Sequence, residues 1–197
     1  VLSHVLLKTS VSSSKQTAPT LSVTGTDLEV ELIGTSLLES DTTKNQKITL
    51  PGKKLIDICK TLPENATVEL YQEKEQVVVR SGRSRFTLSS LPAEEFPYMD
   101  EIKKVANFDI AQNELRALLQ RTSFAMAQHD VRYYLNGVLL EIMPDRISAV
   151  ATDGHRLAMN TLDVNANTDH KIRIIVPRKG VSELIRLLDD TDHPVSI

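Results

Sequence analysis

The sequence of 197 residues has no tryptophan, only four tyrosines and four phenylalanines, and a single cysteine. A folded core must therefore be aliphatic, built from leucine, isoleucine and valine. One cysteine excludes an internal disulfide and fits a reducing compartment. Cys59 falls on the apolar side of a predicted helix, so we expect a packed thiol. No apolar run approaches the ~20 residues of a membrane span, and no secretory signal is visible, so we expect a cytoplasmic protein with no membrane partner.

An excess of charge of either sign is also missing. The chain has 23 Lys and Arg against 26 Asp and Glu, a formal net charge of −3. This balance predicts no general affinity for polyanions, although basic residues segregated to one face can still attract them.

The sequence does contain an internal repeat. VTGTDLEVELIGTSL resembles VATDGHRLAMNTLDV further along, and ITLPGKKLIDICKTLP resembles IIVPRKGVSELIRLLD. Thr26 and Thr152 are 126 positions apart, and so are Pro51 and Pro177. Two anchors at one offset indicate two copies of one structural unit. An earlier pair, HVLLKT and GVLLEI, fits at a slightly larger offset, and the Ser-rich segment 10–20 is predicted to be the extra loop.

Each copy has the pattern of strands followed by a short helix. Alternating apolar residues in the first copy predict strands at 4–9, 21–25, 28–33 and 47–50. Pro51 and Pro177 suit the first turn of a helix, where a missing N–H costs nothing. Apolar faces at helical spacing are formed by Leu55, Ile58, Cys59 and Leu62 in one helix, and by Val181, Leu184, Ile185 and Leu188 in the other. Their polar faces carry Lys53, Lys54 and Lys60, and Arg178, Lys179 and Arg186.

Further elements flank the repeat. Three strands are predicted at 67–72, 76–82 and 85–91, and a strand and a helix within 107–126, whose apolar face holds Leu115, Leu118 and Leu119. The first copy has nothing before it that matches 107–126, and the second ends where its last strands would begin. We therefore expect an α+β chain cut at both ends, with domains at 1–104 and 105–197 that meet within 93–106.

The stretch ATDGHRLA, at 151–158, admits two interpretations. Asp153, His155 and Arg156 are the residue types of a hydrolase site. The chain has no nucleophile elbow, HExxH, Walker loop or GxGxxG motif, so we expect no metal and no cofactor. The first copy keeps Thr-Asp without His-Arg, so Thr152 and Asp153 are interpreted as turn chemistry. A repeat-built protein-interaction module without a DNA role remains a further alternative.

Six stretches, TGTDLE, RSGRSRFTLSSLP, EEFP, DVRYYLNG, ATDGHRLA and VPRKGVSEL, together resemble the bacterial DNA sliding clamp family, the β subunits of DNA polymerase III holoenzyme. The resemblance implies a non-enzymatic processivity factor, a ring of two chains with antiparallel sheets outside and short helices lining a DNA-facing inner surface. In that family each chain has three similar domains. This chain would supply domain I without its N-terminal strand and helix, and domain II without its C-terminal strands, with domain III absent.

The same resemblance assigns three sets of residues. Contacts to double-stranded DNA would come from Lys53, His129, Arg132, Tyr133, Tyr134, Arg178 and Lys179. A groove for short linear clamp-binding peptides of the polymerase III catalytic subunit, the clamp loader and repair polymerases would include Leu135, Thr152, Gly154, His155, Arg156 and Leu157. The homodimer interface of the full-length protein would include Lys54, Arg83, Arg85, Phe86 and Leu88. Strand alternation predicts that only one of Tyr133 and Tyr134 faces outward.

Overall fold

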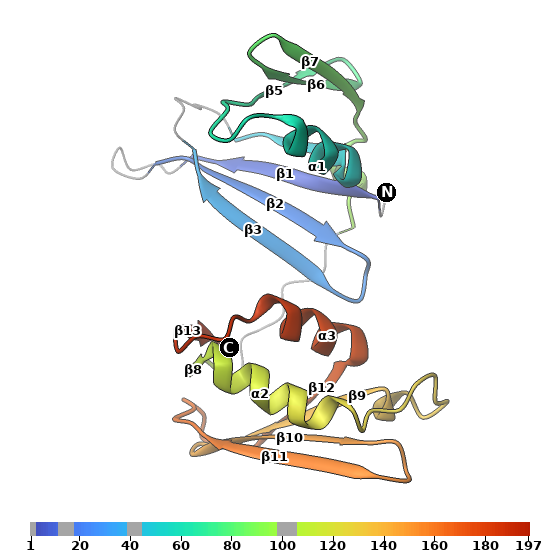
Figure 1. Cartoon of the computed structure of the whole chain (residues 1–197), viewed down its shortest axis with the longest axis vertical. Coiled ribbons are helices and arrows are strands. Elements are labelled where there is room, and N and C mark those ends of the chain that lie inside the picture. The colour runs from blue at the N-terminus through green and yellow to red at the C-terminus, as the bar shows by residue number, and fades with distance from the viewer. Residues whose placement is uncertain (1–2, 12–17, 39–44, 98–105) are drawn as a thin grey trace. The chain divides into compact units, whose positions relative to one another are not determined.

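The computed structural model describes residues 3–11, 18–38, 45–97 and 106–197 (Figure 1). The chain divides into two compact units, Val1–Asp100 and Glu101–Ile197. The expected junction between 104 and 105, and most of the predicted loop at 10–20, fall outside the described residues. The domain limits 1–104 and 105–197 therefore stay a prediction.

The first unit combines two antiparallel sheets and one helix (Figure 1). The first sheet has the order β3-β2-β1-β4 and is formed by β1 (His4–Ser10), β2 (Thr20–Thr26), β3 (Glu31–Leu37) and β4 (Lys47–Pro51). Helix α1 (Gly52–Thr61) follows β4 directly. The second sheet contains β5 (Glu69–Glu73), β6 (Gln76–Ser81) and β7 (Ser84–Ser89), and a 3-10 turn, η1, spans Ala93–Glu95.

Apolar side chains of both sheets and of α1 close the core of the first unit. Leu7 and Leu50 of the first sheet, Ile58 of α1 and Val77 and Val79 of β6 are buried together. The opposite face of the first sheet is covered near Leu6 by Ala93 and Phe96. An aliphatic core, as the scarcity of aromatic residues predicts, therefore holds α1 against both sheets.

The second unit places two helices on one sheet (Figure 1). The sheet has the order β11-β10-β9-β12, formed by β9 (Gly137–Ile142), β10 (Arg146–Thr152), β11 (Leu157–Asp163) and β12 (Ile172–Pro177). Helix α2 (Gln112–Ser123) packs on β9, β10 and β11, and α3 (Arg178–Leu187) packs on β9 and β12. A small sheet pairs β8 (Asp109–Ala111) with β13 (Pro194–Ser196), and a 3-10 turn, η2, spans Tyr133–Leu135.

The predicted repeat is confirmed. Strands β2 and β3 and helix α1 recur 126 residues later, residue for residue, as β10, β11 and α3. The strand order β3-β2-β1-β4 of the first sheet is also the order β11-β10-β9-β12 of the second when each strand is replaced by its counterpart. The predicted helix face of Leu115, Leu118 and Leu119 is buried against the second sheet.

Three local predictions are wrong. The strand predicted at 28–33 begins only at Glu31, because Leu28 adopts a positive φ of 76° in the preceding turn. Pro51 and Pro177 end β4 and β12 and occupy the N-cap positions of α1 and α3 instead of lying within the first turns of these helices. Cys59 is exposed, not packed. Successive helical residues are rotated by about 100°, and because Ile58 takes the buried position, Cys59 is turned toward solvent.

Candidate functional site

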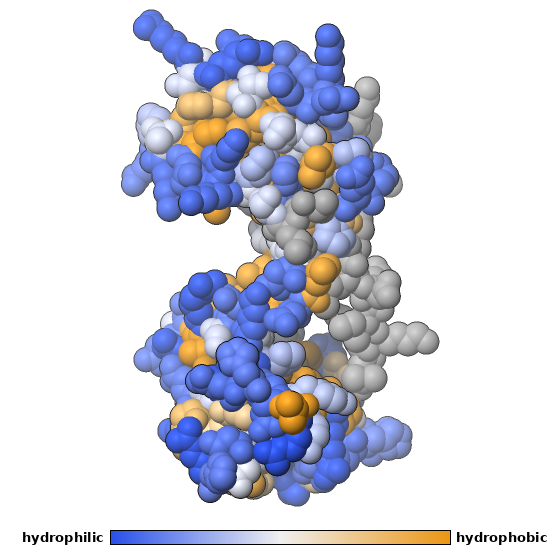
Figure 2. Space-filling model, turned by 90° about the vertical axis from the view of Figure 1, so that its right-hand side faces the viewer, coloured by the Kyte–Doolittle hydropathy of each residue, from blue (hydrophilic) through white to orange (hydrophobic). Residues whose placement is uncertain are grey.

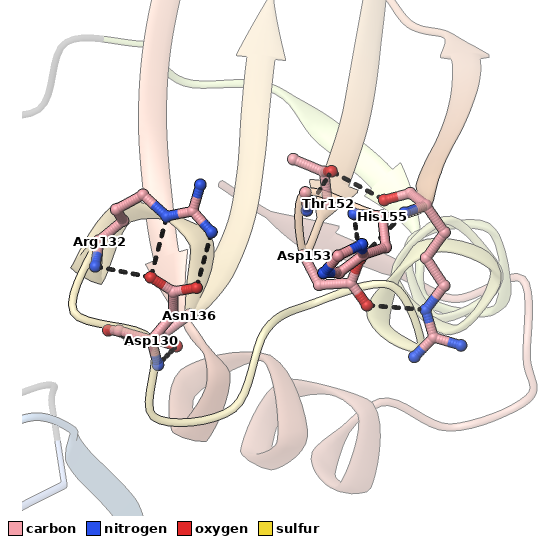
Figure 3. Close-up of polar contacts among 8 residues, drawn as sticks. Asp130, Arg132, Asn136, Thr152, Asp153 and His155 are labelled. Carbon is pink, nitrogen blue, oxygen red and sulfur yellow. Dashed lines mark hydrogen bonds and ion pairs between the residues drawn. The ribbon is translucent and has the colours of Figure 1, made fainter.

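The Thr-Asp pair forms the same turn in both units. Thr152 Oγ1 accepts a hydrogen bond from the N–H of Gly154 (3.1 Å) and donates one to the carbonyl of Arg156 (2.7 Å). Asp153 Oδ1 accepts from the N–H groups of His155 (2.9 Å) and Arg156 (3.0 Å) (Figure 3). Thr26 and Asp27 repeat all four bonds in the turn between β2 and β3. The interpretation of Thr152-Asp153 as turn chemistry is confirmed.

The residue after Asp differs between the two turns. It needs a positive φ in both, 76° at Leu28 and 90° at Gly154. Glycine adopts this conformation without the Cβ strain that leucine meets. A Cβ at Gly154 would also lie only 3.4 Å from Arg132 Nη2, because the Arg132 side chain covers this part of the turn. That distance is an ordinary contact with the end of a flexible side chain, so the positive φ is what favours glycine at 154.

Arg156 joins the turn to the end of α2. Its Nε donates to Asp153 Oδ2 (3.0 Å), its Nη2 donates to the carbonyl of Phe124 (2.9 Å), and its guanidinium lies 5.7 Å from the Phe124 ring centroid. Because Asp153 is committed to these donors, and His155 gives it only a backbone N–H, the turn has no free acid–base pair. Backbone and Arg156 hydrogen bonds hold the pKa of Asp153 below its usual range. This arrangement gives no support to a hydrolase site.

The apolar residues expected to line a peptide groove differ in accessibility. Leu157 is 65% exposed at the start of β11, and Phe124 is 59% exposed. Leu135, in η2, is buried and retains only 9% of its accessible surface. Exposed apolar surface at this turn therefore comes from Leu157 and from Phe124 with the Arg156 stem, and not from Leu135.

The segment 128–136, called here the tyrosine loop, is held by its own side chains. Asn136 Oδ1 accepts from the N–H of Asp130 (3.0 Å), and its Nδ2 donates to the Asp130 carbonyl (2.8 Å). The Asp130 carboxylate accepts from Arg132 Nε (3.0 Å), Nη2 (2.9 Å) and the Arg132 N–H (2.8 Å) (Figure 3). These bonds order a loop that has little apolar packing of its own.

The tyrosine loop presents both of its tyrosines to solvent. Tyr133 is 82% and Tyr134 50% exposed, and their rings meet edge to face with centroids 5.9 Å apart. The prediction that only one faces outward is wrong, because the two lie in η2, a 3-10 turn, and not in the alternating pattern of a strand. His129, in the same loop, is exposed and has a positive φ of 55°.

Acid is expected to loosen the tyrosine loop. The Arg132 side chain, followed by the Arg132 backbone N–H, lowers the pKa of Asp130 from 3.8 to about 2. A lowered folded-state pKa means that the stabilisation is fully present above the unfolded value of 3.8 and is lost as pH falls through about 2. The measurement is the NMR signal of the Arg132 amide during acid titration. Asp130→Asn should abolish the transition, and a midpoint at or above 3.8 would contradict the ion pair.

The two lysines expected at DNA lie at equivalent positions. Lys53 is the second residue of α1, and Lys179, 126 residues later, is the second residue of α3; both are exposed. Arg178 differs from them. Its side chain is half-buried and donates to the carbonyls of Met126 and Ala127.

The residues expected at a subunit interface divide between surface and core. Lys54 and Arg83 are exposed, and Arg85 pairs with Glu73 at 3.0 Å while remaining 54% exposed. Leu88 is buried in the core of the first unit, and Phe86 packs against the same core. In the part of the chain that the structure describes, β7 pairs with β6 on one side and leaves its other side open.

Neither a metal-binding cluster nor a membrane-spanning helix is found within residues 3–11, 18–38, 45–97 and 106–197. No group of three or more His, Cys, Asp or Glu residues there could hold a metal ion. None of the described helices has the length and apolar character needed to cross a bilayer. Hydrophilic side chains cover most of the face drawn in Figure 2, and apolar ones form separate small groups.

Comparison with known proteins gives one consistent family. The model of the DNA polymerase III beta subunit N-terminal domain matches residues 1–100, and that of the central domain matches residues 109–197. The chain belongs to the DNA polymerase III beta subunit family. The resemblance of the six sequence stretches, and the α+β clamp fold it implies, are thereby confirmed.

The relatives of this beta-subunit chain are similar along all or most of its length. The beta sliding clamp of Pseudomonas aeruginosa is 52% identical over 197 residues, which cover all of this chain and 52% of that protein. The beta sliding clamp of Escherichia coli K12 is 44% identical over 178 residues, or 90% of this chain and 48% of that protein. The crystal structure of DNA polymerase III subunit beta from Pseudomonas aeruginosa superposes with a TM-score of 0.90 at 51% identity, covering 100% of this chain and 52% of that one. The chain therefore spans about half the length of the beta-subunit relatives it matches.

The structure adds residues that the sequence did not single out for a beta-subunit site. Phe124 supports Arg156, and Asp130 and Asn136 order the tyrosine loop. The Asn-Gly sequence at 136–137 is typical of a turn, but it does not predict which residue Asn136 bonds to. The Phe124–Arg156 contact joins residues 32 positions apart and carries no local signal.

Proposed function

We propose that this chain contributes two domains to a sliding clamp, a non-catalytic ring that encircles duplex DNA and makes the replicative polymerase processive. Membership of the beta-subunit family supports the role, and the equivalent lysines Lys53 and Lys179 are the observation that carries it. A repeated helix that presents a cation at the same point in each copy gives contacts that track phosphates without reading bases. Such contacts let a ring slide. We also propose a cytoplasmic location, because a bacterial chromosome is replicated there.

The tyrosine loop is proposed to be a second DNA contact. Two exposed aromatic rings beside His129 and Arg132 can hydrogen-bond phosphates and stack on any base that is exposed. We assign these contacts to the place where DNA leaves the face of the ring. His129, Arg132, Tyr133 and Tyr134 then act alongside Lys53 and Lys179.

The β10–β11 turn is proposed to receive the short linear peptides of partner proteins: the polymerase III catalytic subunit, the clamp loader and repair polymerases. Leu157 supplies exposed apolar surface, and Arg156 presents its aliphatic stem while its guanidinium is anchored. Gly154 and His155 leave backbone accessible beside them, and Thr152 and Leu135 support the wall. Recognition by a few apolar anchors is typical of peptide binding.

The open edge of β7 is proposed to pair with another subunit in the full-length homodimer. An unpaired strand edge invites pairing unless it is charged or covered. The exposed cations Lys54, Arg83 and Arg85 fit an acidic partner edge, while Phe86 and Leu88 hold β7 to its own core.

Duplex binding as a function of salt tests the proposal. Log K falls as log salt rises, and the magnitude of this negative slope, called here the salt slope or the slope, decreases by about 0.9 for each phosphate contact removed. Lys53→Ala with Lys179→Ala should lower the slope of the 197-residue chain by about 1.8, measured by fluorescence anisotropy of a labelled duplex. Lys74→Ala, which removes an exposed lysine from the β5–β6 turn, is the matched control and should leave the slope unchanged. No duplex binding by the wild type, or an equal loss in the control, would overturn the DNA contact.

A further inference from the structure

The Arg178 side chain forms its hydrogen bonds within the protein. Arg178 is the first residue of α3, and its Nη2 donates to the carbonyls of Met126 (2.7 Å) and Ala127 (3.0 Å), while its Nε also donates to Ala127 (3.2 Å). Those two carbonyls lie just beyond the end of α2, immediately before the tyrosine loop. A planar guanidinium is suited to holding two neighbouring acceptors in fixed positions.

Asn136 holds the other end of the tyrosine loop. Its backbone carbonyl accepts from the N–H of Arg178 (2.9 Å), and its side-chain amide makes the reciprocal pair of bonds with the Asp130 backbone. Between the two ends, the N–H of Ala127 donates to the carbonyl of Leu135 (2.9 Å). The Arg178 side chain therefore bonds to the residues just before the loop, and its backbone N–H bonds to the last residue of the loop. The Asn136 side chain links that last residue to Asp130 inside the loop.

The first unit provides an internal comparison. Gly52, at the position equivalent to Arg178, donates its N–H to the carbonyl of Ser3 (3.0 Å), just as Arg178 donates to Asn136. The backbone bond is therefore part of the repeated fold. The guanidinium contacts are not, because Gly52 has no side chain and a Cβ there would lie 3.0 Å from Val5 Cγ1. The Arg178 side-chain bonds to Met126 and Ala127, the two residues that lead into the tyrosine loop, are therefore particular to the second unit.

We propose that Arg178 and Asn136 are positioning residues, which bracket the tyrosine loop so that Tyr133 and Tyr134 are ordered before DNA arrives, and that Arg178 does not itself contact phosphate. This revises the expectation that Arg178 binds DNA. Ordering a loop in advance removes a cost that binding would otherwise carry. The DNA part of the inference rests on the proposed function, whereas the bracket itself does not.

Two measurements on the 197-residue chain separate positioning from phosphate contact. The first is hydrogen exchange of the loop amides without DNA, where the N–H groups of Asp130, Arg132 and Leu135 are hydrogen-bonded. The second is the salt slope of duplex binding. Arg178→Ala and Asn136→Ala should speed exchange in the loop and weaken duplex binding by roughly tenfold, because two tyrosine side chains must then be ordered on binding. Their salt slopes should stay at the wild-type value. Lys179→Ala, the control next in sequence, should lower the slope by about 0.9 and leave loop exchange unchanged.

Arg178→Lys guards against a simple failure to fold, because it keeps the charge but loses the planar fork. We expect it to exchange nearly as fast as Arg178→Ala; full recovery of binding with a wild-type slope and slow exchange would favour a charge role and overturn the bracket. A slope lowered by about 0.9 in Arg178→Ala, or loop exchange unchanged in both Arg178→Ala and Asn136→Ala, would overturn it as well. If the wild type does not bind duplex DNA, the proposed function fails. Hydrogen exchange of the loop amides still decides whether Arg178 and Asn136 order the tyrosine loop.

Discussion

Gly137→Ala is expected to destabilise the second unit by about 3 kcal/mol, at the upper end of overpacking costs. Gly137 begins β9 opposite Pro177 of β12, and a Cβ there would lie 2.4 Å from the backbone carbonyl oxygen of Val176 and 3.0 Å from Ile175 Cγ2. A carbonyl oxygen in a strand ladder cannot turn aside as a flexible side chain would. The strands must separate, and because Asn136 precedes this position, the tyrosine loop should loosen with them. Native-state hydrogen exchange of the β9 and β12 amides measures the loss.

Gly34→Ala is the matched control for that substitution. Gly34 also lies in a strand, β3, but nothing is within 4 Å of the Cβ position. It should change stability by no more than about 0.5 kcal/mol. Because replacing glycine by alanine lowers the entropy of the unfolded chain and by itself stabilises, a similar loss in both variants would mean that the contact with Val176 does not explain the effect.

Leu119→Ala is expected to cost about 3–4 kcal/mol, within the range for fully buried leucines. Leu119 is completely buried on α2, in the cluster that joins this helix to β9 and β10. Removing its side chain leaves a cavity that aliphatic neighbours fill only in part. The slowest-exchanging amides of β9 and β10 report the free energy of opening of this unit.

Leu187→Ala controls for the loss of a helical leucine as such. Leu187 is 54% exposed at the end of α3 and should cost less than about 1 kcal/mol. If Leu119→Ala cost no more than Leu187→Ala, the packing of α2 on the sheet would not be a main source of stability.

Sequence patterns predicted well those features that depend on short separations along the chain. The Thr-Asp turns could be anticipated because their four bonds span at most four residues, from Thr26 to Val30 and from Thr152 to Arg156. The helix beginning after Pro177 follows from apolar spacing in the same way. Prediction failed where Leu28 and Cys59 depend on how a turn or a helix is rotated against its neighbours.

The sequence by itself determined that this chain holds two copies of one strand-and-helix unit of the beta-subunit family, with matching lysines at the start of matching helices. Tertiary structure alone decided which polar residues are available. Arg178 looked like its neighbour Lys179, yet it meets carbonyls some 50 positions earlier in the chain, and Arg156 meets Phe124 across 32 positions. Hydrogen bonds over such separations form only once α2, the tyrosine loop and α3 have packed together, so no local pattern of residues could predict them.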